Sequence, residues 1–578
     1  MKQLLILLLI QLVATTQAQT LNLVSPSNAT TTVNNPKQFI TGTTCAGCTI
    51  TVNNTTVKVY STLVFVYQAT LVSGVNTFQV NAQAGNKTIT KQVIYNYTPA
   101  KPITATDSNI IESISILPSG NVALQVGDVL SIRVKAKPNC SLFMADTITL
   151  TEQPASANKG VAGYYTTQYM VTAASKLLLT SFVFSLRKNS TLLHTLKDKN
   201  LYSLFNSTSQ PTIAKVNSPY TPIYSGISED RLGGTKIGFL DTSVLLQPIA
   251  RYNNLYKVQL LPNYHVYIPI SNLTLLPQGN PIPQAVSQNI SVTGDSLYDY
   301  LRITFDTKLP YLTQAIAKPN QLLLDIFGAS LNTNWIMQYP ETLQVIENVD
   351  ATQLQNQQIR LTINLAGKQL WGYKSYYEGN TLVVQIRRQK QNLNLSNMRI
   401  ALDAGHGGSN LGALGIAGRY EKEFTLLIAQ QLQTMLLVEG ATTSITRTSD
   451  ASIENQERLN NMRKTMPDFA ISIHLNSAAD PLRVKGYSTY YKYNAYRGLS
   501  QSIYNNLSGL GLTGWGVTGN FNFFLNSATE FPTALIECLF ISNPADEEKV
   551  HDPAFRTQFC KKIILGIKDW LQNCSTNK

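Results

Sequence analysis

Three short apolar runs in the last third of the chain are each followed by one side chain that can bind a metal or transfer a proton. They are Met398 to Asp403 leading to His406, Phe469 to Ile473 leading to His474, and Thr533 to Ile536 leading to Glu537. Such runs predict short buried strands, and the glycines around His406 predict a sharp turn after the first strand. Open α/β sheets bind their ligands at the carboxyl ends of strands. The chain has only 5 His, and two stand at corresponding strand ends, which indicates a site more than core packing.

A helical pattern lies between the first two runs. Its apolar positions, spaced by three and four, are Phe424, Leu427, Ile428, Leu432, Met435 and Leu436. Gly440 ends the pattern. Glu421 precedes these positions, so we expect it in the first turn of the helix, able to point back toward the loop that carries His406.

Two imidazoles and one carboxylate are a ligand set that suits zinc. Catalytic zinc sites keep three protein ligands and an open position for water. The pattern therefore predicts one Zn²⁺ bound by His406, Glu421 and His474. Glu423 is a rival ligand, but its place on the helix points it to a different side from Glu421.

Hydrolysis at such a site also needs a carboxylate outside the metal shell. This group takes a proton from the attacking water and passes it to the leaving amine. Glu537 fits that role. A salt-bridged carboxylate at a strand end is the structural alternative for the same residue.

Four segments carry a family resemblance. They are Asp403-Ala-Gly-His-Gly-Gly, Glu421-Lys-Glu, Ser472-Ile-His-Leu-Asn476 and Glu537-Cys-Leu-Phe-Ile-Ser-Asn543. In order and separation they resemble the zinc-dependent N-acetylmuramoyl-L-alanine amidases of the amidase-3 family, over residues 397–574. The resemblance implies a twisted, mostly parallel sheet with helices on both faces. It also implies hydrolysis of the amide bond between N-acetylmuramic acid and L-alanine in peptidoglycan, with Glu537 as the catalytic carboxylate and zinc on the other three residues.

The sequence departs from the family pattern at a few positions. Ala404 stands in place of the usual Pro, Leu475 in place of Ala and Leu539 in place of Gly. None of these changes removes a candidate ligand. Some relatives insert an extra helix that covers the metal, but residues 487–524 leave space for one ordinary helix and a loop. We therefore expect no built-in plug and no need for an activator.

Residues 288–388 resemble a second known domain. Four strand-like runs alternate or are continuously apolar, as in a two-sheet β fold. The segments Phe305-Asp-Thr, Leu309-Pro-Tyr311 and Leu324-Asp-Ile-Phe-Gly328 resemble the AMIN domain. That domain accompanies this amidase class, and the resemblance implies targeting to peptidoglycan.

The residues between the export signal and residue 288 predict further β modules. Residues 19–102 show strands at regular spacing and resemble an Ig-like β-sandwich. Residues 105–210 predict a β-rich module of unknown role, in which Lys176 to Leu186 is expected to be a buried strand. Residues 212–278 resemble an SH3-like β-barrel, with a structural β spacer as the alternative.

The first residues have the form of an export signal. Residues 1–18 contain an apolar run from Leu4 to Val13 and small residues before a predicted cleavage site after Ala18. The run is too short to span a bilayer. We therefore expect an exported protein without a transmembrane segment, located in the periplasm or associated with the cell wall.

Composition agrees with a multidomain exported protein and narrows its partners. A chain of 578 residues predicts roughly three to five domains. Charged residues make up only 14% of the chain, and the net charge is +13, which favours an anionic polymer as partner. Because the positive charge is spread thinly and forms no basic helix or block, we expect peptidoglycan and no nucleic acid as partner, a choice that charge alone does not decide.

The 6 Cys form no complete framework. Cys45 and Cys48 have no second pair with which to complete a zinc ribbon, so we expect a local disulfide across a turn. Cys538 is expected to be a packed thiol and not a nucleophile.

Two functional alternatives remain open from the sequence. One is a zinc hydrolase of the same fold that cleaves another peptide bond of the wall. The other is a non-catalytic wall-binding protein, since β modules make up most of the chain before the enzyme-like part. A regulatory protein partner is not identifiable from the residues.

Overall fold

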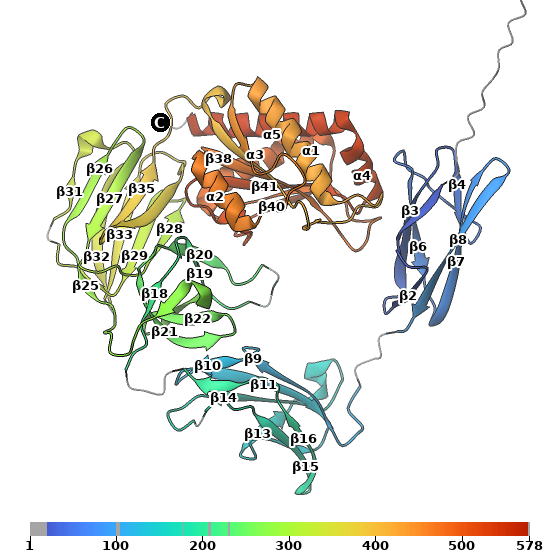
Figure 1. Ribbon diagram of the computed structural model, residues 1–578, viewed down its shortest axis with the longest axis horizontal. Coiled ribbons are helices and arrows are strands. Elements are labelled where there is room, and N and C mark those ends of the chain that lie inside the picture. Colours follow the sequence, from blue (N-terminus) through green and yellow to red (C-terminus); the bar gives the residue numbers. More distant parts are fainter. Residues whose placement is uncertain are drawn as a thin grey trace, which may run out of the picture.

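The computed structural model describes residues 20–99, 104–175, 177–205, 210–228, 230, 232–333, 335–355 and 357–575. The expected export signal, residues 1–18, lies outside these ranges. The chain forms a series of β domains followed by one domain that contains both helices and strands (Figure 1). Among the described helices, none combines the length and hydrophobicity needed to cross a membrane.

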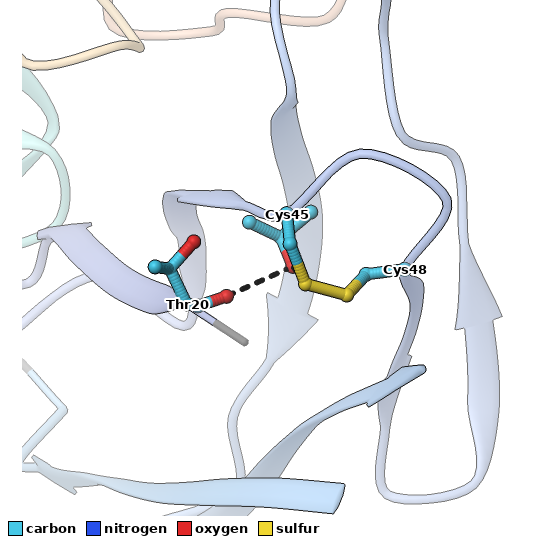
Figure 2. The surroundings of a disulfide bond; sticks show 4 residues. Thr20, Cys45 and Cys48 are labelled. Carbon is cyan, nitrogen blue, oxygen red and sulfur yellow. Dashed lines mark hydrogen bonds between the residues drawn. A yellow bond between two sulfur atoms is a disulfide. The ribbon is translucent and has the colours of Figure 1, made fainter. Parts of the chain in front are cut away.

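The N-terminal sandwich, residues 20–99, consists of two sheets that share one core. One sheet has the order β1 (Leu21–Ser25), β3 (Lys37–Thr44), β6 (Val64–Thr70); the other has the order β2 (Thr30–Val33), β8 (Lys87–Tyr97), β7 (Gly74–Ala84), β4 (Thr49–Val52), β5 (Thr55–Val57). Ile40 and Phe65 from the first sheet pack with Phe78 and Tyr95 from the second. Cys45 and Cys48 form a disulfide across the turn between β3 and β4 (Figure 2), which confirms the expected local bridge.

The second module, residues 104–205, is built mainly on a seven-stranded antiparallel sheet. Its order is β16 (Thr191–Lys197), β15 (Val183–Lys188), β12 (Ser141–Met144), β13 (Ile148–Glu152), β14 (Tyr164–Met170), β11 (Val129–Ala136), β9 (Ile111–Leu117). The expectation of a buried strand from Lys176 to Leu186 is wrong over most of that range. The strand begins only at Val183, and Leu178 is 83% exposed. Lys176 lies outside the described residues.

The third module, residues 210–275, is not a separate sheet, because the second module contributes two strands to it. The order is β17 (Tyr202–Leu204), β10 (Val122–Leu124), β21 (Leu245–Tyr252), β22 (Leu255–Leu261), β23 (Tyr264–Pro269), β19 (Thr221–Tyr224), β20 (Lys236–Leu240), with β18 (Ala214–Val216) between β21 and β24 (Leu273–Leu275). A buried ion pair joins the same two modules, since Lys257 Nζ lies 2.7 Å from Asp128 Oδ1. The two modules are therefore joined by shared backbone pairing and by charge.

The paired-sheet domain, residues 285–387, has two main sheets. One has the order β31 (Met337–Gln338), β26 (Ile290–Gly294), β27 (Tyr298–Thr304), β35 (Thr381–Arg387), β34 (Tyr373–Glu378); the other has the order β28 (Tyr311–Ile316), β29 (Gln321–Phe327), β33 (Gln358–Leu365), β32 (Ile346–Leu354); β25 (Ala285–Val286) pairs with β30 (Ala329–Ser330). Its apolar core is continuous with that of the third module, because Val258 and Ile268 belong to the same buried cluster as Leu324 and Val384.

The C-terminal domain, residues 397–575, has a six-stranded sheet. The order is β37 (Thr442–Ile445), β36 (Arg399–Ala404), β38 (Phe469–Asn476), β41 (Thr533–Phe540), β39 (Tyr487–Tyr490), β40 (Gly514–Thr518). All neighbours are parallel except β39 and β41, which are antiparallel. The central strands β36, β38 and β41 are almost entirely buried, as expected for strands covered on both faces.

Helices cover both faces of this sheet. They are α1 (Glu421–Val438), α2 (Asn455–Thr465), α3 (Arg497–Leu507), α4 (Pro544–His551) and α5 (Pro553–Ser575), with short 3-10 turns η5 (Asn494–Tyr496), η6 (Ser508–Leu510) and η7 (Leu525–Ser527). Ile400 and Ile471 pack with α1, α3 and α5 on one face. The intervening residues Ala401 and Ala470 pack with α2 and η7 on the other. The period-two alternation of the strands thus divides the core into two layers.

The N-terminal sandwich contacts the C-terminal domain, although most of the chain separates them in sequence. Figure 1 shows the sandwich beside α4. Val64 and Val66 of β6 bury Ile416, which lies in the loop between β36 and α1. Two polar contacts flank this cluster: Lys37 Nζ lies 2.6 Å from Asp480 Oδ2, and Ser61 N donates to Glu548 Oε1 at 2.8 Å.

The paired-sheet domain is joined to the C-terminal domain through buried aromatic residues. Trp371, 4% exposed, is part of the core of the C-terminal domain. Its ring centroid lies 5.1 Å from that of Trp570 on α5. Gln369 accepts a hydrogen bond from Trp570 Nε1 and donates to the Ala495 carbonyl. The core of the C-terminal domain is therefore completed by a residue of the preceding domain.

Candidate active site

β36 and β38 end side by side, and this brings the two candidate histidines together. The strands are parallel, with Ala404 opposite Ile473. His406 lies in the turn after β36 with a left-handed φ of 61°. His474 lies inside β38, near its end, and not after the strand as expected from the sequence. The two ring centroids are 5.0 Å apart.

Close approach of backbone and side chains explains one of the glycines in this turn. A Cβ atom on Gly405 would collide with the imidazole of His474. Only glycine therefore lets the chain pass beneath that ring and turn back to present His406.

Glu421 is the first residue of α1 and points between the two imidazoles. Its Oε1 atom lies 3.1 Å from His406 Nε2 and 3.2 Å from His474 Nδ1. The backbone N–H of Leu475 donates to Oε1 at 2.9 Å, and that of Ala413 donates to Oε2 at 2.9 Å. Glu421 is 4% exposed. The two hydrogen bonds fix the orientation of its carboxylate from the loop before α1 and from the strand β38.

This donor set fits a zinc ion. The three ligand atoms lie within 4.8 Å of one another. A tetrahedral zinc at about 2.0–2.2 Å from each ligand keeps its ligand atoms roughly 3.3 Å apart, close to the two separations from Glu421. Asn410 Oδ1 lies 2.8 Å from His406 Nδ1, an outer contact of the kind that orients a ligating imidazole.

The charges at the cluster favour an ionised ligand. Burial alone would raise the pKa of Glu421, but hydrogen bonds from His406 and His474 bring that pKa well below its ordinary value. Burial also opposes protonation of His474, but the hydrogen bond and charge of Glu421 raise its pKa overall. A carboxylate that stays ionised is what metal ligation requires.

Glu537 lies beside His474 on the neighbouring strand. β41 continues beyond it to Phe540, and the parallel register sets Glu537 directly opposite His474. Paired residues on adjacent strands project from the same face of the sheet. Glu537 is partly exposed whereas His474 is buried. The structure thus places Glu537 next to the cluster, with access to solvent.

A buried network beneath the turn holds His406 in place. Asp403 accepts hydrogen bonds from Thr446, Arg458 and Ser472 at 2.8, 2.9 and 2.7 Å. Arg458 also donates to the carbonyl oxygens of Ala404 and His406. Burial would raise the pKa of Asp403, but the charge of Arg458 lowers it overall.

Arg447 supports the same turn from the side of α1. It donates to the carbonyl oxygens of Ala404 and Gly405 at 3.0 Å each, and to that of Lys422 at 2.6 Å. Together with Arg458 it donates hydrogen bonds to backbone carbonyls on both sides of the turn. Structural hydrogen bonding is therefore the observed role of Arg447.

Three residues near the site were not predicted from the sequence. Asn410 lies against His406, and Phe523 lies with its ring centroid 5.4 Å from that of His474. Asn522 binds the third module. All three occupy irregular segments without periodicity. Glu423, the rival ligand, lies outside the cluster and accepts hydrogen bonds from Tyr420 N and Arg419.

The chain is similar to known proteins over its last two domains. Residues 400–569 match the profile of a family described as N-acetylmuramoyl-L-alanine amidase (Amidase_3), and residues 289–386 match the AMIN domain. A Staphylococcus aureus protein named "Probable cell wall amidase LytH" is 34% identical over 179 residues, which cover 30% of this chain and 58% of that protein. The match thus spans less than two thirds of LytH.

Solved structures similar to this chain cover its C-terminal domain. The catalytic domain of CwlV, an N-acetylmuramoyl-L-alanine amidase from Bacillus (Paenibacillus) polymyxa var. colistinus, is 28% identical; the match covers 30% of this chain and 98% of that one, with a TM-score of 0.29. An N-acetylmuramoyl-L-alanine amidase from Clostridium difficile 630 is 26% identical; the match covers 30% of this chain and 97% of that one, also with a TM-score of 0.29. The C-terminal domain thus matches the N-acetylmuramoyl-L-alanine amidase family model, and the domain before it matches the AMIN model.

Proposed function

We propose that the protein is an exported, zinc-dependent amidase that hydrolyses the bond between N-acetylmuramic acid and L-alanine in peptidoglycan. The observation that carries this proposal is the convergence of His406, Glu421 and His474 with Glu537 alongside. The family match of residues 400–569 supports the class of reaction and the substrate.

His406, through Nε2, His474, through Nδ1, and Glu421 would hold the metal. A zinc ion bound there supplies Lewis-acid activation of water and of the scissile carbonyl. Burial of Glu421 and His474 keeps bulk water away from these ligands and strengthens their electrostatic interactions.

Glu537 is the proton carrier. It accepts a proton from the attacking water and delivers it to the departing amine of L-alanine. Its position opposite His474 supports this role, since a proton carrier has to lie within reach of the reacting atoms. Asp403 is unsuited to the role because Arg458, Thr446 and Ser472 already occupy its oxygens.

The other domains deliver this site to the wall. In this proposal residues 1–18 are the export signal, the protein acts in the periplasm or at the cell wall, and the AMIN domain binds peptidoglycan. The N-terminal sandwich is Ig-like and the third module SH3-like. The net charge of +13 supports attraction to the peptide carboxylates of the wall.

No helix of the C-terminal domain is proposed to plug the site. The α-helix between the second His and Glu537, α3, packs on the core with α5 through Leu499 and Ile503. We therefore expect the purified protein to cleave wall material without an activator. Activity that appears only after a partner protein is added would contradict this.

The test is digestion of purified peptidoglycan by the full chain, with and without a chelator. We expect release of intact stem peptides with free L-alanine amino ends, detected by mass spectrometry, and loss of that release with the chelator. Fragments cut within the stem peptide would indicate a different zinc hydrolase. Binding to the wall without cleavage would indicate a non-catalytic protein.

Replacement of Glu537 by Ala separates the metal from the proton carrier. We expect Glu537→Ala to reduce hydrolysis by about 10²–10⁴-fold, the range supplied by general acid–base catalysis, while zinc content stays equal to that of the wild type. The exposed Glu457 on α2 provides the control, Glu457→Ala. Activity retained in Glu537→Ala would remove this residue from the mechanism.

A further inference from the structure

The segment 519–524, between β40 and η7, forms an aromatic wall beside the candidate metal site. The wall consists of Phe521 and Phe523. Phe523 meets His474 edge-on, with ring centroids 5.4 Å apart. Phe521 stacks on Phe523 at 6.2 Å and lies 4.6 Å from the ring of Tyr490. Both rings are only partly buried, so they offer apolar surface to a molecule bound at the site.

Asn522 lies between these two rings in sequence and binds a different domain. Its Nδ2 group donates to the carbonyl oxygens of Gly234 at 2.8 Å and Leu232 at 3.1 Å, both in the third module. Its Oδ1 atom accepts from the backbone N–H of Lys236 at 2.9 Å. These bonds join the irregular segment of the C-terminal domain to the loop that precedes β20.

Two buried lysines complete this contact. Lys492 Nζ donates to Asn522 Oδ1 at 3.0 Å, and Lys236 Nζ donates to the Asn522 carbonyl oxygen at 3.3 Å. The Lys236 ammonium also lies 5.4 Å from the ring centroid of Phe524. Lys236 and Lys492 are 7% and 6% exposed. Because an amide left unpaired among such groups would be costly, the side chain of Asn522 has one strongly favoured position.

We propose that Asn522 is a positioning residue, through which residues 232–236 of the third module hold the aromatic wall beside His474. The third module then takes part in placing substrate, although it contributes no group to the metal cluster. For its substrate this inference rests on the proposed function. The wall would contact the methyl and C–H surface of the lactyl and alanyl groups on either side of the scissile amide.

The anchoring is tested by hydrogen–deuterium exchange on the full chain. In Asn522→Ala we expect backbone amides of residues 519–524 to exchange about tenfold faster or more than in the wild type, because opening of the segment costs less. Gln369→Ala is the matched control, since it removes another amide that bridges two domains, between the AMIN domain and α5. Unchanged exchange in Asn522→Ala, or an equal change in Gln369→Ala, would overturn the anchoring.

Placement of substrate is tested by kinetics on a soluble muropeptide. In Asn522→Ala we expect KM to rise about five- to tenfold, kcat to stay within about twofold, and zinc content to match the wild type. Asn522→Asp is the second variant, to be used if Asn522→Ala folds poorly. It keeps the acceptor for Lys236 and Lys492 but loses the donor, so we expect a smaller rise in KM than in Asn522→Ala. Faster exchange with an unchanged KM would refute the role in substrate placement.

A failure of the proposed function gives a different result from a failure of this inference. If the wild type hydrolyses no muropeptide, the proposed function is wrong, while the exchange data still decide whether Asn522 anchors the segment. If the wild type is active and Asn522→Ala behaves like Gln369→Ala in both assays, the proposed function stands and this inference falls.

Discussion

His406 makes a defined contact through each of its ring nitrogens. Nε2 lies 3.1 Å from Glu421 Oε1, and Nδ1 lies 2.8 Å from Asn410 Oδ1. If Nδ1 carries the proton and donates it to Asn410, Nε2 is left as an unprotonated donor for a metal. In that tautomer the contact with Asn410 also orients the ring.

Removal of this outer contact should weaken metal binding. We expect Asn410→Ala to lower zinc affinity about 10- to 100-fold, the usual effect of losing a hydrogen bond to a ligating imidazole. Competition with a chromophoric chelator measures the affinity. Asn505→Ala, at an exposed position of α3, is the control. Equal zinc affinities for the two variants would show that Asn410 does not support the metal.

At the residue scale, local patterns account for part of the site. The strand ends and the helix start that carry His406, His474 and Glu421 each have a local signal in the sequence. Asn410 and Phe523 have none, because their contacts depend on how irregular segments turn in three dimensions. The third module's contact with Asn522 is still harder to predict from the sequence, since it depends on the placement of a domain nearly three hundred residues earlier.

Among the elements, α4 is a helix without an apolar repeat that would predict it. Eight residues are too few for a clear apolar repeat. The signals that mark the start of a helix are nevertheless present. Asn543 accepts from two backbone N–H groups, Pro544 begins the helix, and Asp546 and Glu547 lie in the first turn. A helix with a clear apolar repeat is easier to predict: the pattern that starts after Glu421 and ends at Gly440 corresponds to α1, Glu421–Val438.

Glu547 on α4 links that helix to the loop before α1. Both of its carboxyl oxygens accept from the backbone N–H of Ala417, at 3.1 and 3.0 Å. Burial raises the pKa of Glu547 from 4.5 to about 7, against the lowering effects of the Ala417 hydrogen bond and the charge of Arg419. The folded protein therefore retains a proton on Glu547 at pH values where the unfolded chain has lost it.

This difference makes stability depend on pH. Between pH 4.5 and about pH 7 the folded state binds more protons than the unfolded state, so the free energy of unfolding falls as pH rises. The total loss is at most about 3 kcal/mol and is complete above that window. We expect Glu547→Gln to flatten this dependence, measured as the urea midpoint between about pH 5 and pH 8. Glu457→Gln should keep the wild-type slope; an unchanged slope in Glu547→Gln would contradict the assignment.

For the whole molecule, the boundary between the AMIN domain and the C-terminal domain is a shared core. Because Trp371 is buried against Trp570, Trp371→Ala should destabilise the C-terminal domain by about 3–5 kcal/mol. Trp335→Ala, at a 64% exposed position, should change stability little. Urea unfolding of both full-length variants measures the difference. Equal midpoints would show that the Trp371 contact does not stabilise the fold.

The contact between the N-terminal sandwich and the C-terminal domain depends on Ile416. A charge at this position would be buried against Val64 and Val66 without a partner, which is strongly unfavourable. We expect Ile416→Asp to release the sandwich and increase the radius of gyration in small-angle X-ray scattering. Leu414→Asp, where the side chain is 43% exposed, should leave it unchanged. An identical radius in wild type and Ile416→Asp would refute this arrangement.

The contact at Ile416 closes the chain into a ring, since the first described domain touches the last. Tethering of this kind gives the two surfaces an effective concentration of roughly millimolar or below, set by the span between them. A surface of three core side chains therefore stays associated without high intrinsic affinity. A substitution that removes this packing would open the ring and free the loop that joins His406 to Glu421.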